Sequence, residues 1–202
     1  MGLRKPHKEP FTWDDYRDFP DDECWEIIRG EAFAMTPAPS TRHQEIVMEL
    51  AGEMRSHFKG GRCKVYPSPT DVKLSDTDIV QPDILVVCDS TQIKKTHIDG
   101  PPSLVIEIIS PSSSLHDRGR KLELYGRSGV REVWLVTPYP SLIEVLVLDG
   151  DSYRIKHSYV KEDTLSSPSF PDLAIELASI FDFPIDPEEE IQLIKERRPS
   201  YG

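Results

Sequence analysis

Three ionisable residues in the middle of the chain have types and spacings that suggest a shared chemistry. Asp83 directly precedes an apolar run, Glu107 stands inside the next apolar run, and Lys121 follows on a helical stretch. Neighbouring strands of a sheet lie about 4.8 Å apart, so we expect Asp83 and Glu107 to meet at one level of a sheet. Two carboxylates that close repel each other unless a proton or a cation lies between them. Mg²⁺ suits such a pair, because it prefers oxygen ligands and takes one or two protein carboxylates.

Simpler interpretations of the same residues remain open from spacing alone. Burying an unpaired carboxylate costs several kcal/mol, so Glu107, in the stretch SLVIEIIS, either meets a partner or projects from a strand edge into solvent. Pro82-Asp83 is equally compatible with the start of a strand. The dipeptide by itself is weak evidence for a site, because two further Pro-Asp pairs occur in the chain. Lys121 is spaced for an ordinary surface ion pair with Asp117, one helical turn away.

Hydrophobic periodicity predicts the elements that position these residues. The runs at 84–88 and 104–109 are continuously apolar, which is typical of central strands covered on both faces. The order of elements predicts an α/β (α+β) fold with one mixed sheet and a helix on each side. We expect a single domain, with a core at about 11–182 and a charged tail at 183–202. The remaining predicted elements are a hairpin at 24–35, a helix from Ser40 or Thr41 to Phe58, strand pieces at 63–66 and 70–74, a helix at 115–127, a strand at 132–136, a hairpin at 142–160 and a short helix at 173–181.

Composition limits the possible functions. The chain has 202 residues and a formal net charge of −11, which opposes non-specific attraction to nucleic acid, so a nucleic-acid partner requires a local basic surface. No apolar run reaches the ~18 residues of a membrane span, and the N-terminus lacks the apolar region of a signal peptide. Three widely spaced cysteines favour a reducing, cytoplasmic setting and argue against disulfides or a zinc site.

Other catalytic motifs are absent from the sequence. There is no GxSxG, no GxGxxG, no Gly-rich phosphate loop and no histidine pair at metal-ligand spacing on one helix. Glycoside hydrolysis by two carboxylates has weaker support, because nothing supplies an aromatic platform for a sugar.

Several sequence blocks in order resemble one family. The blocks are WEIIRGE (25–31), PAPSTRHQEI (37–46), QPDILVV (81–87), LVIEIISPSS (104–113), DRGRKLELY (117–125), GVREVWLV (129–136) and FPDLAIELASIF (170–181). Together they resemble the bacterial Uma-type "putative restriction endonucleases", a group of the PD-(D/E)XK nuclease superfamily, over roughly residues 11–182. The resemblance implies a restriction-endonuclease-like core and Mg²⁺-dependent cleavage of phosphodiester bonds, with Mn²⁺ as a possible substitute.

The resemblance also assigns roles to residues. Asp83 matches the acidic position of the PD half-motif and Glu107 the (D/E) position, whereas Ile109 stands where the superfamily has lysine. The group supplies this cation from the following helix, where Lys121 stands. Asp83, Glu107 and the Ile108 carbonyl would then hold the metal ion, which polarises the phosphate and activates water. Lys121 would orient that water or stabilise the developing charge.

Further residues are weaker candidates. Asp71, Glu31 and His43 are candidates for lining the pocket; the alternative is that Asp71 and Glu31 are solvent-facing strand residues and His43 is an exposed first-turn residue. Residues 115–131 carry five basic and two acidic side chains, and Arg118 and Arg120 could follow a DNA backbone from this patch. Because no DNA-reading motif is visible, we expect a homodimer or a partner. The alternative function is a nuclease-fold binding or regulatory module with weak or no catalysis, which Ile109 and the acidic net charge favour.

Overall fold

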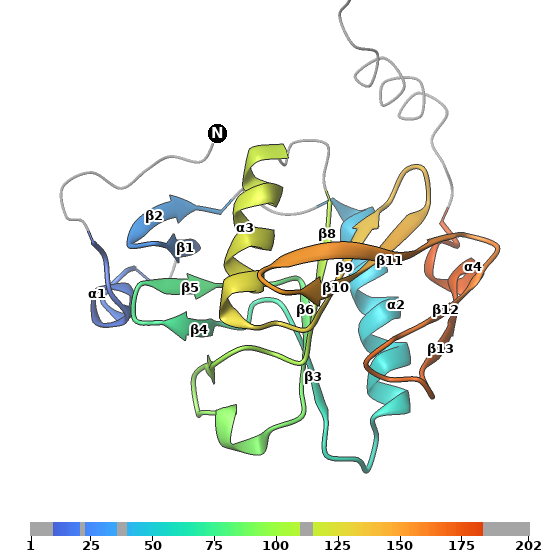
Figure 1. Ribbon diagram of the computed structural model, residues 1–202, viewed down its shortest axis with the longest axis horizontal. Coiled ribbons are helices and arrows are strands. Elements are labelled where there is room, and N and C mark those ends of the chain that lie inside the picture. The colour runs from blue at the N-terminus through green and yellow to red at the C-terminus, as the bar shows by residue number, and fades with distance from the viewer. Residues whose placement is uncertain (1–9, 21–22, 36–39, 110–114, 184–202) are drawn as a thin grey trace, which may run out of the picture.

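The computed structural model contains the two long predicted helices and the predicted central strands in the expected order, together with further strands that were not predicted (Figure 1). The structure describes residues 10–20, 23–35, 40–109 and 115–183. No helix in these ranges is long and apolar enough to cross a membrane. The predicted tail, 183–202, falls almost entirely outside the described residues. The helices are α1 (Trp13–Arg17), α2 (Thr41–His57), α3 (Leu115–Ser128), α4 (Leu177–Ile180) and the short 3-10 helix η1 (Ser90–Gln92).

The central feature is a six-stranded mixed sheet in the order β11-β10-β9-β8-β6-β3. Strands β8 and β9 are parallel, and every other neighbouring pair is antiparallel. All four residues of β6 are buried, as the continuous apolar run predicted. The strands are β3 (Lys64–Pro67), β6 (Ile84–Val87), β8 (Leu104–Ile108), β9 (Glu132–Thr137), β10 (Leu142–Asp149) and β11 (Ser152–Val160).

A second sheet, which the sequence did not predict, lies beside the first. It has five strands in the order β2-β1-β5-β4-β7 and includes the predicted N-terminal hairpin, which turns at Arg29 and Gly30. The predicted piece at 70–74 does not continue β3 but belongs to this second sheet, where it forms β4 beside β5 and β7. The strands are β1 (Trp25–Ile28), β2 (Glu31–Ala34), β4 (Val72–Ser75), β5 (Asp78–Val80) and β7 (Ile98–Asp99).

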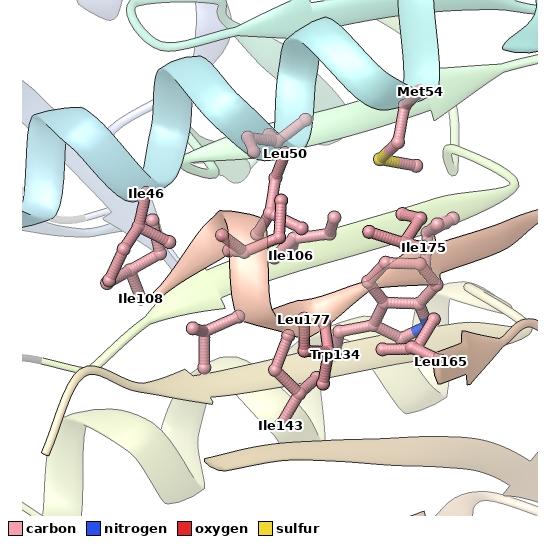
Figure 2. Packing of buried hydrophobic residues seen from close by; sticks show 14 of the residues in the cluster. Ile46, Leu50, Met54, Ile106, Ile108, Trp134, Ile143, Leu165, Ile175 and Leu177 are labelled. Carbon is pink, nitrogen blue, oxygen red and sulfur yellow. The ribbon is translucent and has the colours of Figure 1, made fainter. Parts of the chain in front are cut away.

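Helix α2 covers one face of the central sheet (Figure 2). The Ser40 hydroxyl accepts a hydrogen bond from the His43 N–H and starts the helix, as a serine N-cap does. Side chains at helical spacing, including Ile46, Leu50 and Met54, are fully buried against strand residues such as Ile106. This packing fixes the position of the first turn of α2 relative to β6 and β8.

Helix α3 covers the opposite face. Leu124 and Tyr125 pack with Leu85, Val105 and other residues that alternate with those facing α2. The helix ends at Ser128, and Gly129 follows with a φ of +84°, a conformation that glycine adopts without steric cost. The fold therefore places the side chains of α3 over the face of the sheet to which Glu107 belongs.

Two predictions near the edges of the fold are wrong. The segment PDLAIEL does not begin a helix: Ala174–Glu176 form strand β13, which pairs with β12 (Thr164–Ser166), and only α4 follows. Cys63 and Cys88 form a disulfide, contrary to the prediction of free thiols. The register of β3 and β6, with Lys64 opposite Val87, places these cysteines opposite each other at the ends of the strands.

Candidate active site

Strand register brings Asp83 and Glu107 to one level. Ile84 on β6 lies opposite Ile106 on β8 in an antiparallel pair, so the preceding Asp83 lies opposite the following Glu107. The Ile108 N–H donates a hydrogen bond of 2.7 Å to Asp83 Oδ2. Because N–H and C=O of one strand residue point to the same side, the Ile108 carbonyl also faces the Asp83 edge.

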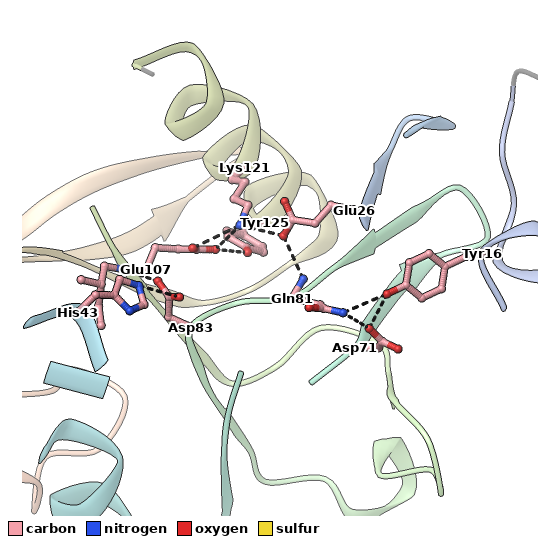
Figure 3. Close-up of polar contacts among 10 residues, drawn as sticks. Tyr16, Glu26, His43, Asp71, Gln81, Asp83, Glu107, Lys121 and Tyr125 are labelled. Carbon is pink, nitrogen blue, oxygen red and sulfur yellow. Dashed lines mark hydrogen bonds and ion pairs between the residues drawn. The ribbon is translucent and has the colours of Figure 1, made fainter. Parts of the chain in front are cut away.

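Lys121 reaches Glu107 from helix α3 (Figure 3). Its Nζ lies 3.2 Å and 3.3 Å from the two carboxylate oxygens of Glu107. The same ammonium group lies 2.9 Å from Glu26 Oε1, on strand β1 of the second sheet. The Lys121 side chain is only 20% exposed, so it does not belong to a solvated helix face. Three elements that are distant in sequence thus converge on one ammonium group.

Tyr125, one helical turn after Lys121, completes the surroundings of Glu107. Its hydroxyl donates a hydrogen bond of 2.5 Å to Glu107 Oε1. Burial raises the pKa of Glu107 to about 7; Lys121 opposes this rise, and the charges of Asp83 and Glu26 add to it. Burial and the Glu107 charge raise the pKa of Tyr125 well above its usual value, so this phenol stays protonated and acts as a donor.

The charge on Lys121 is strongly stabilised. Burial by itself would lower the pKa of this lysine, but Glu107 and Glu26 outweigh that effect and raise it. The ammonium group therefore stays cationic and cannot serve as a general base near neutral pH. With Asp83, Glu107 and Glu26 ionised, three negative charges surround one positive charge. This excess of −2 favours binding of a further cation.

His43 contacts Asp83 from the first turn of α2. Its Nε2 lies 3.1 Å from Asp83 Oδ1, and its side chain is 12% exposed, so the interpretation as an exposed residue is wrong. Its buried Nδ1 has no hydrogen-bond partner among the described residues. Asp83 is thus held by His43 on one oxygen and by the Ile108 N–H on the other.

Asp71 lies beside the site rather than in it. Its Oδ1 accepts hydrogen bonds from Tyr16 Oη at 2.7 Å and from Gln81 Nε2 at 2.8 Å. The Gln81 backbone N–H donates to Glu26 Oε1 at 3.0 Å, which connects this group to Lys121 (Figure 3). Asp71 is half-buried, not solvent-facing.

Glu31 and the guanidinium of Arg120 both lie at strand β2 of the hairpin. Glu31 lies at the turn end of the hairpin, opposite Ile28, and the hairpin carboxylate that reaches Lys121 is Glu26. The Arg120 guanidinium lies over the Phe33 ring at 4.2 Å. The side chain of Arg118 lies outside the described residues.

Sequence reasoning missed Glu26, Gln81 and Tyr125. Glu26 carries the signal that identified Glu107, since it is a carboxylate between buried apolar neighbours of one strand. Tyr125 lies four residues after Lys121 and therefore on the same helix face. Only the packing of the second sheet against α3 shows that these residues meet.

Comparisons with known proteins show the family of the chain. The family model of Uma2, described as "Putative restriction endonuclease", matches residues 13–178. This chain belongs to the Uma2 family. It is 30% identical over 149 residues to "Uncharacterized protein slr1290" of Synechocystis sp., a match that covers 73% of this chain and 78% of that protein. The resemblance found in the sequence blocks is thereby confirmed.

A solved structure shares the fold. It comes from Anabaena variabilis and is described as a "putative nuclease belonging to DUF820". The match has a TM-score of 0.67 at 22% identity and covers 85% of this chain and 98% of that one. The mixed sheet flanked by helices is therefore a fold that this chain shares with that solved structure.

Proposed function

We propose that this protein is a Mg²⁺-dependent endonuclease that hydrolyses DNA phosphodiester bonds at Asp83, Glu107 and Lys121. The observation that carries the proposal is the position of Lys121 Nζ, 3.2 Å from Glu107 Oε1. In the nuclease pattern, the lysine stands two residues after the acidic residue, and this chain has Ile109 there. Lys121 brings the missing ammonium group to the same carboxylate from α3.

The residues present suit a hard divalent cation. Asp83 and Glu107 supply carboxylate oxygens at one level of the sheet, and the Ile108 carbonyl faces the same edge. No cluster of three or more His, Cys, Asp or Glu side chains able to enclose a metal ion is found among the described residues. Mg²⁺ needs only one or two protein carboxylates and keeps water and substrate phosphate as its other ligands. When bound, it would polarise the phosphate and lower the pKa of a water molecule.

The protein's own groups would have separate tasks. Lys121, held cationic by Glu107 and Glu26, would stabilise negative charge that develops on the phosphate oxygens. Tyr125 and Glu26 fix the orientations of Glu107 and Lys121 through hydrogen bonds. His43 and the Ile108 N–H fix the two oxygens of Asp83. Such preorganisation places the charges before the substrate binds.

The comparisons support this proposal by description only. The family is described as "Putative restriction endonuclease", and the solved structure from Anabaena variabilis as that of a "putative nuclease". Both descriptions match phosphodiester hydrolysis, and neither states a metal ion or a substrate. The chemistry of the donor set is the reason for assigning Mg²⁺ here, with Mn²⁺ as its closest substitute.

A cleavage assay tests the proposal. Purified protein is incubated with plasmid and with single-stranded DNA in Mg²⁺, in Mn²⁺ and in EDTA, beside Asp83→Asn and Glu107→Gln. Lys156→Ala is the control, because Lys156 is exposed on β11. We expect cutting only with metal, lost in both site variants and kept in the control. Cutting that persists in Glu107→Gln would refute the assignment, and no cutting under any condition would favour a binding module.

A further inference from the structure

Basic side chains gather in two neighbouring pockets of this acidic protein. The first pocket, of about 270 Å³, includes Lys94, Lys95, Thr96 and Tyr66 in its lining. The second, of about 530 Å³, includes Arg55, Lys59, Lys64 and again Tyr66. The two linings together contain four lysines and one arginine but only one acidic residue, Asp71. In the whole chain acidic residues outnumber lysine and arginine by 35 to 24, so the charge is locally inverted.

Few ion pairs engage the cations of these pockets, although Lys64 donates a hydrogen bond to the Gly61 carbonyl and Lys94 to the Thr91 carbonyl. Arg55, Lys59, Lys64 and Lys95 form no ion pair with any described residue, and Lys94 lies 3.9 Å from Asp99. The α3 patch differs, since Arg127 pairs with Asp78 and Glu123 pairs with Arg29. A cation without an ion pair binds a phosphate at a lower cost in free energy than a cation that must first break an ion pair.

Tyr66 links the pockets to the candidate active site. It lies opposite Leu85 on β6, and Leu85 lies opposite Val105 on β8, so the side chain of Tyr66 projects from the same face as that of Glu107. From strand geometry, the Cα atoms of Tyr66 and Asp83 are about 8 Å apart. Gln81 also lines the first pocket, and its N–H contacts Glu26 beside Lys121.

Asp71 does not cancel the positive charge of the two pocket linings. One of its oxygens already accepts hydrogen bonds from Tyr16 and Gln81, which stabilise its charge within the protein. The remaining lining offers ammonium and hydroxyl donors around an aromatic ring, including Thr70 and Thr96. Cationic grooves with aromatic side chains bind unpaired nucleotides, because phosphates meet the cations and bases stack on the rings.

We propose that the two pockets at Tyr66 bind a single-stranded stretch of nucleic acid that leads into the site at Asp83. The inference rests on the proposed hydrolytic function and names the path of its substrate. Lys94 and Lys95 contact phosphates nearest the cleavage site, Tyr66 stacks on a base, and Arg55, Lys59 and Lys64 continue the path around edge strand β3. The expected α3 patch around Arg120 is then not the principal phosphate contact.

Salt-dependent binding tests this path without catalysis. A labelled single strand of roughly 12 nucleotides is titrated with the protein by fluorescence anisotropy in EDTA and in Ca²⁺, across a series of salt concentrations. Each phosphate contact to a single strand contributes about 0.7 to the slope of log affinity against log salt. Lys94→Ala/Lys95→Ala should therefore reduce the slope by about 1.4. Tyr66→Leu should weaken binding roughly tenfold, and Tyr66→Phe should not.

Controls separate this inference from the proposed function. Lys156→Ala on β11 should keep the wild-type slope, and thermal melts confirm that each variant is folded. An unchanged slope in Lys94→Ala/Lys95→Ala would overturn the path even if the wild type cuts DNA. Equal or tighter binding of a duplex of the same length would also overturn it. If the salt slopes are as predicted but no Mg²⁺-dependent cutting is seen, the binding path is supported and only the proposed hydrolysis is overturned.

Discussion

The Nζ of Lys121 on α3 lies 3.2 Å from Oε1 of Glu107 on β8, and the two residues are 14 positions apart in the chain. Side chains two positions apart in a strand share a face, so Ile109 shares the face on which this contact forms. Strand β8 has no ammonium group of its own beside this carboxylate. Packing of α3 on that face brings the ammonium group of Lys121 to it. The positive charge of the site is therefore carried by α3, and the site depends on the position of that helix.

Glu107→Gln should stabilise the protein at alkaline pH. The folded-state pKa of Glu107 is about 7, above its ordinary value of 4.5, so stability is lost as pH rises from about 4.5 through 7. Glutamine mimics the protonated acid and escapes this loss. Urea unfolding should show a gain on the order of 3 kcal/mol at pH 8 and little difference at pH 5. A variant less stable than the wild type at pH 8 would contradict the buried-charge interpretation.

Metal affinity should rise with pH for the same reason. A proton and Mg²⁺ compete for Glu107, whose pKa is about 7 without metal. The ionised fraction grows about tenfold between pH 6 and pH 8, so the association constant for Mg²⁺ should rise by about the same factor. Calorimetric titration measures it, with Glu107→Gln as the reference. An equal affinity at both pH values in the wild type would exclude Glu107 as a ligand.

Two glycines of α3 should respond oppositely to alanine. A Cβ at Gly126 would lie 2.8 Å from the backbone oxygen of Asp151, at the turn between β10 and β11. Gly126→Ala should therefore cost about 1–3 kcal/mol and displace the helix that carries Lys121. Gly119 has open space around its Cβ position, so Gly119→Ala should gain up to about 1 kcal/mol of helix propensity. Chemical denaturation of both variants checks the contrast, and a stabilising Gly126→Ala would disprove the close packing.

Much of the site could be predicted from sequence because its carboxylates lie on adjacent central strands. Apolar runs identified β6 and β8, and the spacing of strands then placed Asp83 near Glu107. Glu26 could not be predicted, since its approach to Lys121 depends on a second sheet whose existence no local pattern indicated. The Cys63–Cys88 bond likewise depends on the register of two strands, which sequence spacing does not determine.

Moving the lysine back into the strand should restore part of the activity. Ile109 shares the face of Glu107 and is partly buried against the α3 side of the sheet. Ile109→Lys combined with Lys121→Met should cut DNA at least tenfold faster than Lys121→Met alone, because the ammonium group returns to the carboxylate. Ile109→Met with Lys121→Met is the matched control. Equal rates for the two double variants would show that position 109 cannot supply the cation.

Single-turnover cleavage by Lys121→Met tests the central claim most directly. Loss of one preorganised positive group should lower the rate about 10²–10³-fold. DNA affinity in EDTA should change by less than about threefold, because Lys121 is buried between Glu107 and Glu26 and lies outside the Tyr66 pockets. A rate within about twofold of the wild type, with the variant folded, would contradict the account.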